Sequence, residues 1–154
     1  EAIFEPLGMS ATELRGSPAF AMWSTLDDMT LLLGELIQPR LISPATHNDF
    51  IAEQFVGISG TIPGLGRFDP CPWGLGTELR GTKHPHWTGL RNSPSTFGHF
   101  GGAGTMMWVD PTIRSGLVAL TDRQFDEWGD EAIALWSELS DAAIDDLQHA
   151  EALS

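Results

Sequence analysis

Three apolar strand candidates, joined by short connections, constrain the fold of this chain more than any other feature. They cover residues 96–100, 105–109 and 117–121. Asp110 and Pro111 begin the second connection and Gly116 closes it, a composition typical of turns. Because parallel strands need a crossover of about a dozen residues or more, the short connections predict an antiparallel meander.

A long amphipathic helix is predicted after these strands. Apolar residues recur at every third or fourth position, and acidic residues occupy the other side. The apolar positions are Trp128, Ala132, Trp136, Leu139, Ala143 and Leu147. Such a stripe needs an apolar surface to cover it, and the sheet is the obvious one. We therefore expect an α+β fold in which the terminal helix packs on the sheet.

Two shorter helices are predicted before the sheet. Residues 1–20 have the pattern of a helix end followed by a loop. Thr25 can cap a helix in STLDDMTLLLGELIQ, which stops near Pro39. Ser43 and Pro44 then begin another helix in SPATHNDFIAEQF.

Glycine and proline punctuate the middle of the chain. Residues 57–72 are predicted to form a loop, 73–80 a strand, and 81–95 a long loop of the kind that often carries function. We expect one partial domain over residues 1–154, with a helical part in 1–56 and the sheet and terminal helix in 73–154.

The last strand candidate, GLVAL, is apolar on both faces, which predicts a strand covered on both sides. No strand candidate follows it, so one of its edges is expected to lack a partner. Either another copy of the chain pairs there, or the neighbouring strands belong to a part that is missing. An open edge of this kind favours a homo-oligomer.

Composition excludes several classes of function. The formal net charge is −13, and ten of the 21 acids lie between Asp122 and Glu151, which argues against nucleic acid as a partner. We find no apolar run of about 18 residues and no signal-peptide pattern, so we expect no membrane span. The single Cys71 excludes an intramolecular disulfide. The compartment stays unassigned, with the cytoplasm slightly favoured.

The segment FGHFGGAG places His99 beside glycines at the edge of a strand. Glycine lets another molecule approach the backbone, and a free N–H there can point at a ligand oxygen, as in an oxyanion hole. Histidine can donate to a carbonyl or carboxylate, or transfer a proton. The alternative is a histidine at a strand end with glycines forming a tight turn, and the spacing alone leaves both open.

Other site chemistries have weaker support. The possible metal ligands Cys71, His84, His86 and His99 have no recognised spacing, so we expect no metal and no cofactor. GGAG lacks the Gly-Lys-Ser/Thr ending of a phosphate loop, and no Gly-x-Ser-x-Gly elbow supports a serine triad. Among the tryptophans, Trp128 and Trp136 are expected in the core. Trp87, in the long loop, is expected to be a pocket wall.

The order of several segments resembles the C-terminal half of the serine beta-lactamase-like hydrolases, which include class C beta-lactamases, D,D-peptidases and related esterases. These segments are IFEPLGM, STLDDMTLLLGELIQ, WGLGTEL, GHFGGAG and SGLVALTDR, followed by the terminal helix. The loop PHWTG..NSP.TFGHFG is similar to that of a bacterial subgroup of serine hydrolases. The resemblance covers nearly the whole chain.

The resemblance implies specific roles at the strand edge. The family builds its site from Ser-x-x-Lys, Tyr-x-Asn and a Lys-Thr-Gly or His-x-Gly strand motif. His99, Phe100 and Gly101 match the third motif. By resemblance, His99 orients the nucleophile network or the substrate, and Gly102 supplies an oxyanion N–H. Phe100, Gly101 and Trp87 are then expected to contact the substrate.

The first two motifs are absent from this chain. It contains no tyrosine, and the residue three places before its single lysine, Lys83, is Arg80. We therefore expect the rear portion of a hydrolase that acts on an ester or amide through an acyl-serine intermediate, inactive by itself. Beta-lactam, peptide and small ester remain open as substrates. The alternative is a non-catalytic binding or assembly module that kept the fold.

Overall fold

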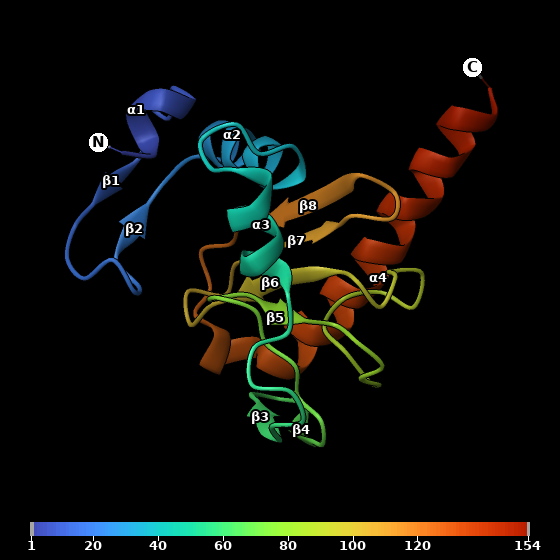
Figure 1. Cartoon of the computed structure of the whole chain (residues 1–154). Coiled ribbons are helices and arrows are strands. Elements are labelled where there is room, and N and C mark those ends of the chain that lie inside the picture. The colour runs from blue at the N-terminus through green and yellow to red at the C-terminus, as the bar shows by residue number, and fades with distance from the viewer. Residues whose placement is uncertain (1, 154) are drawn as a thin grey trace.

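The computed structural model describes residues 2–153, which form three layers (Figure 1). The central layer is an antiparallel sheet in the strand order β5-β6-β7-β8. Its strands are β5 (Glu78–Leu79), β6 (Phe97–Phe100), β7 (Met106–Asp110) and β8 (Ser115–Ala119). Helices α2 (Leu26–Ile37) and α3 (Pro44–Ile51) pack on one face, and α4 (Phe125–Ala152) packs on the other. The predicted α+β class is confirmed.

Strand alternation divides the core between the two faces of the sheet. Phe97 and Val109, which pair across β6 and β7, pack with Leu33 of α2. Trp108 faces the opposite way into the α4 layer, where its indole Nε1 donates to Ser140 Oγ at 2.9 Å. The sheet is therefore sealed by apolar side chains on one face and by apolar side chains and a buried hydrogen bond on the other.

Strand β8 is covered on both faces, as its apolar sequence predicts. Val118 packs in the α2 layer, whereas Leu117 packs in the α4 layer. Within residues 2–153, no strand pairs with the outer edge of β8. The strand begins at Ser115, two residues before the predicted start, because Gly116 pairs with Val109 and does not close the turn. A Cβ at Gly116 would lie 2.6 Å from the carbonyl oxygen of Trp108.

The predicted helix starts are confirmed by their capping bonds. Thr25 Oγ1 accepts from the Asp28 amide at 3.3 Å, and Ser43 Oγ accepts from the Thr46 amide at 3.1 Å. The terminal helix α4 contains a kink at Trp128, where φ is −154° and ψ is 21°. Across residues 2–153, we find no helix with both the length and the apolar character needed to cross a membrane.

Two loop predictions need correction, because short hairpins occupy them. Residues 57–72 contain β3 (Gly60–Ile62) paired with β4 (Gly66–Phe68). Ile62 is 2% exposed and anchors this hairpin in the α4-side core. Near the N-terminus, the predicted helix end is α1 (Phe4–Leu7), and the loop after it contains the antiparallel pair β1 (Glu13–Leu14) and β2 (Met22–Trp23).

The predicted strand over 73–80 is shorter than expected. A turn closed by the Gly74 amide and the Thr77 carbonyl, 2.8 Å apart, precedes β5. Trp73 forms isolated bridges with Gln54 and Glu78. This segment therefore forms a turn before β5 and places the Trp73 backbone beside that strand.

Loop 81–95 is anchored by the buried carboxylate of Glu78. Its Oε1 lies 2.8 Å from Lys83 Nζ and 2.9 Å from His86 Nε2, and its Oε2 accepts from Trp87 Nε1 at 2.5 Å. Burial alone raises the pKa of Glu78, but the contacts with His86 and Lys83 outweigh burial and hold it below its ordinary value. The single lysine of the chain, Lys83, is thus buried and ion-paired with Glu78.

Asp110 at the end of β7 anchors the same loop where it joins β6. Its carboxylate accepts from the Ser93 amide at 2.6 Å, the Ser93 hydroxyl at 2.7 Å and the Thr96 hydroxyl at 3.0 Å. It also accepts from the Thr112 amide at 3.0 Å. Burial raises the pKa of Asp110, and these hydrogen bonds together lower it below its ordinary value.

Candidate active site

The end of β6 places His99 and Phe100 on opposite faces of the sheet. His99 is exposed, pairs across the ladder with Met107, and packs edge-on against Trp73 with ring centroids 5.4 Å apart. Phe100 instead packs under α4, with its ring 4.9 Å from that of Phe125 and 5.5 Å from that of Trp136. Strand alternation therefore turns the Phe100 side chain into the α4-side core, so a contact of Phe100 with substrate stays a prediction for its backbone.

The amide of Gly102 lies just beyond this strand. The Gly101 amide donates to the Thr105 carbonyl at 3.0 Å and completes the β6–β7 pairing. The Gly102 carbonyl accepts from the Phe125 amide at 2.9 Å, which anchors the turn to the start of α4. Among the residues the structure describes, none accepts a hydrogen bond from the Gly102 amide. Gly102 is exposed, so this donor is available to a ligand.

Not every glycine of the segment is required by the fold. A Cβ at Gly98 would lie 2.2 Å from the Met107 carbonyl, and Gly104 has φ of +74° and would bring a Cβ 2.0 Å from the Arg123 carbonyl. At Gly101 and Gly102, a Cβ would meet nothing within 4 Å, and neither residue has a positive φ. Packing within residues 2–153 explains the first two glycines, whereas the space beside the last two is open.

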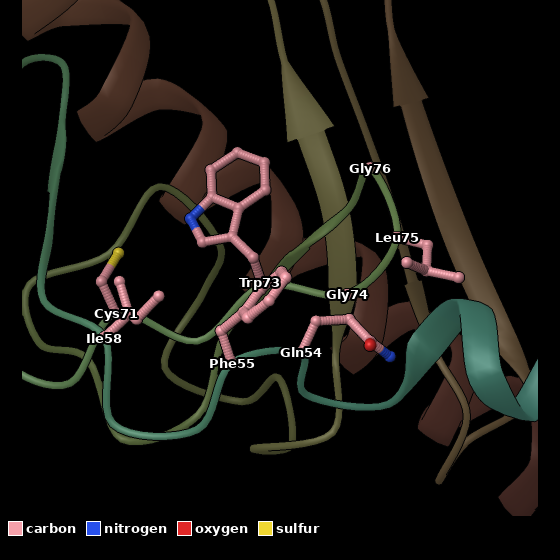
Figure 2. A pocket seen from close by; sticks show the side chains of 8 residues that line it. All are labelled: Gln54, Phe55, Ile58, Cys71, Trp73, Gly74, Leu75 and Gly76. Carbon is pink, nitrogen blue, oxygen red and sulfur yellow. The ribbon is translucent and has the colours of Figure 1, made fainter.

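Two cavities meet near His99. One, of about 400 Å³, lies between α2, α3 and the sheet, and His99 lines it. The other, of about 490 Å³, is lined by Trp73 and its neighbours (Figure 2). Gly76 lines both cavities, and the ring pair of His99 and Trp73 stands between them. His99 therefore lines one cavity directly and contacts the lining of the other through Trp73.

Trp73 is the site residue that sequence reasoning misses. It is 38% exposed, and its backbone carbonyl accepts from the Gln54 amide at 2.7 Å. The only sequence signal is an aromatic residue between Pro72 and Gly74, a pattern that indicates a tight turn but does not indicate which residue packs against the tryptophan. Its contact with His99, 26 residues later, depends on the tertiary fold.

Trp87 lies in the core and lines neither of the two cavities. It is 1% exposed, its indole nitrogen is bound to Glu78, and its ring stacks on His86 with centroids 5.4 Å apart. This burial corrects the interpretation of Trp87 as a pocket wall. Long loops often carry exposed functional residues, but this one is folded back and anchored by buried carboxylates.

His86 belongs to the same structural network. Its Nδ1 accepts from the Thr88 amide at 3.1 Å, so the ring proton lies on Nε2 and is donated to Glu78. Burial lowers the pKa of His86 more than Glu78 raises it, which favours the neutral ring. Across the part of the chain that the structure describes, no three metal-ligating side chains come together.

The antiparallel sheet between the α2–α3 layer and the long helix α4 is the arrangement of a beta-lactamase-like fold. The Beta-lactamase family matches residues 1–139, and the chain belongs to this family. The crystal structure of a beta-lactamase from Mycobacterium bovis is similar, with a TM-score of 0.88 and 45% sequence identity. The match covers 94% of this chain and 53% of that one, so this chain spans about half the length of that protein. No curated protein matches this chain.

Proposed function

We propose that this chain is the rear portion of a beta-lactamase-related serine hydrolase that cleaves an ester or amide through an acyl-serine intermediate. His99 and Gly102 are its contributions to the chemistry. The observation that carries the proposal is the Gly102 amide, which is exposed and has no acceptor among residues 2–153, three residues after His99, which itself lines an open cavity. Family membership and the similar beta-lactamase structure support the reaction class.

The proposed chemistry follows from where charge develops. A serine oxygen attacks the substrate carbonyl, the carbonyl oxygen becomes an oxyanion, and the leaving group departs as the acyl-serine forms. The Gly102 N–H donates to that oxyanion, together with the amide of the serine itself. His99 orients the nucleophile network or the substrate. Removal of one such donor typically costs about 100- to 1000-fold in kcat.

The serine and its base are proposed to come from outside this chain. The sequence has no Ser-x-x-Lys and no tyrosine for Tyr-x-Asn. Lys83 cannot serve as the base, because it is 4% exposed and its ammonium group is held by Glu78 and the Leu79 carbonyl. We therefore expect no turnover by this chain alone.

A chimaera tests this proposal. The part of the Mycobacterium bovis relative that this chain does not cover is joined to residues 1–154. The chimaera should react with a fluorophosphonate probe and hydrolyse p-nitrophenyl acetate, whereas the isolated chain should do neither. Saturable, probe-sensitive hydrolysis by the isolated chain would contradict the proposal.

Two substitutions at one position isolate the oxyanion donor in the chimaera. Gly102→Pro removes the N–H, whereas Gly102→Ala keeps it and places its Cβ in open space. We expect a loss of about 100-fold or more in kcat for the proline variant and a change of less than about fivefold for alanine. Circular dichroism checks that both variants fold. Equal activities would remove Gly102 from the proposed oxyanion hole.

The second candidate function is a non-catalytic binding or assembly module. The absence of both nucleophile motifs from this sequence favours it. In that case the same strand edge binds a carboxylate or peptide without cleaving it. The reading frame upstream of Glu1 discriminates between the two. Ser-x-x-Lys and Tyr-x-Asn encoded there support the hydrolase, and a start codon next to Glu1 supports the module.

A further inference from the structure

The cavity beside Trp73 has an apolar lining. Its side-chain wall consists of Phe55, Ile58, Cys71, Trp73 and Leu75, with Gly74 and Gly76 as bare backbone (Figure 2). Gln54 is the single polar side chain among the lining residues, and its amide nitrogen donates to the carbonyls of Asp49 and Ala52. No lysine or arginine lines the cavity to pair with an anion.

This lining is unusually exposed for apolar side chains. Phe55 is 81% exposed, Ile58 54% and Leu75 55%. Phe55 also has φ of +53°, the left-handed region that non-glycine residues seldom adopt. Core burial does not explain its conformation, because most of its ring faces solvent. Contiguous exposed apolar surface and a strained backbone both mark binding sites.

The cavity is joined to the proposed catalytic edge through Trp73. The indole contacts the His99 ring, and its backbone is held on both sides, by Gln54 and by the bridge to Glu78. Backbone pairing therefore fixes the Cα from which the indole projects toward His99. Through this ring contact the cavity borders His99, which precedes Gly102 by three residues in the chain.

We propose that the Trp73 cavity binds the apolar acyl group of an ester and makes this chain select uncharged acyl groups over acyl groups that carry a carboxylate. The inference rests on the proposed hydrolase function. Each methylene group moved from water to apolar surface strengthens binding by roughly fourfold. A carboxylate in the same place loses hydration with no cation to pair it, and the net charge of −13 opposes it further.

Binding to the isolated chain of residues 1–154 is the first test, because binding does not require the nucleophilic serine. The probes are methyl butyrate, methyl hexanoate and methyl octanoate, with monomethyl suberate as a matched ester that carries a distal carboxylate. The readout is the indole ¹⁵N–¹H resonance of Trp73, assigned with Trp73→Phe. We expect the Trp73 signal to shift, affinity to rise along the series, and monomethyl suberate to bind at least tenfold more weakly than methyl octanoate.

Matched substitutions locate the binding. Trp73→Ala should lower the affinity for methyl octanoate at least tenfold. Trp23→Ala is the control, because Trp23 is also exposed, at 59%, and lines neither cavity. Phe55→Ser gives an independent test at a surface position if Trp73→Ala fails to fold, and it should produce a similar loss. The inference would be overturned if methyl octanoate and monomethyl suberate bound equally. It would also be overturned if the affinity for methyl octanoate did not depend on Trp73 and Phe55.

The chimaera separates this inference from the proposed function. Rising kcat/KM from p-nitrophenyl acetate to the butyrate and hexanoate esters supports both. Hydrolysis with a flat or falling series refutes the acyl-pocket assignment and leaves the hydrolase standing. Trp73-dependent ester binding without any hydrolysis or probe labelling refutes the hydrolase and leaves only an apolar ester-binding site.

Discussion

The segment that enters β6 and the segment that leaves it differ in how they use their polar groups. In loop 81–95, the lysine, a histidine and a tryptophan are bound to Glu78 of β5. Hydroxyl groups at the end of the loop are bound to Asp110 of β7. The end of β6 has an exposed histidine, His99, and the turn that leaves the strand has an available Gly102 amide. Buried polar groups need partners, whereas a site must keep some groups free for its ligand.

Tryptophans and glycines near β6 likewise differ in whether they serve the fold or lie at the open edge. Trp87 is fully buried, whereas Trp73 is exposed beside His99. Gly98 is required by its close neighbours, whereas Gly102 has open space around it. Loop 81–95 therefore stabilises the sheet, and the edge beyond β6 is free to bind. Substitutions on either side should affect different properties.

Glu78→Gln should have the largest effect on stability. The change leaves Lys83 as a buried ammonium without its carboxylate, and breaking a buried ion pair typically costs about 3–5 kcal/mol. Denaturant unfolding measures the loss. Glu131→Gln is the control, because its contact with Arg123 is 3.4 Å and Glu131 is 75% exposed, so a change below about 1 kcal/mol is expected. Similar losses for both would mean that the network does not anchor the loop.

Gly98→Ala should be the next largest effect. The added Cβ would lie 2.2 Å from the Met107 carbonyl, and forced overpacking costs about 1–3 kcal/mol. Gly101→Ala meets open space and should change the free energy of unfolding by less than about 0.5 kcal/mol. Thermal unfolding of the two variants compares them directly. A destabilised Gly101→Ala would show that this glycine serves the fold.

Acid should weaken the fold in two stages. The pKa of His86 lies below its ordinary 6.5, so the folded state binds fewer protons than the unfolded state, and stability falls as pH drops below 6.5. The pKa values of Glu78 and Asp110 lie below their ordinary 4.5 and 3.8, so their contributions are present above those values and are lost at lower pH. Melting temperatures measured from pH 8 to 3 test this order. A melting temperature that rises on acidification would contradict all three signs.

Self-association is the smallest effect we predict. The outer edge of β8 has no partner strand within residues 2–153, so another copy of the chain can pair there. Light scattering should show an apparent mass that rises with concentration. A monomer at every concentration would show that this edge does not bind another copy.

Local pattern predicted most of the scaffold. Helices α2 and α3 follow from Thr25 and Ser43 as caps and from apolar spacing over adjacent turns, and the meander follows from its short connections. The sequence did not predict the β3–β4 hairpin, because strand Gly60–Ile62 is too short to show an alternating pattern within a segment rich in glycine and proline. Its anchor, buried Ile62, contacts residues far along the chain.

The sequence by itself determined the order of helices and strands, the His-x-Gly edge, and the absence of the nucleophile motifs, because periodicity, capping and motif spacing are local properties. The tertiary structure decided which tryptophan borders the site, which glycines are free, and where the single lysine is held. Trp73 and Trp87 both lie in glycine- and proline-rich segments. One packs on His99 and the other is bound to Glu78, through contacts that form only when the layers assemble.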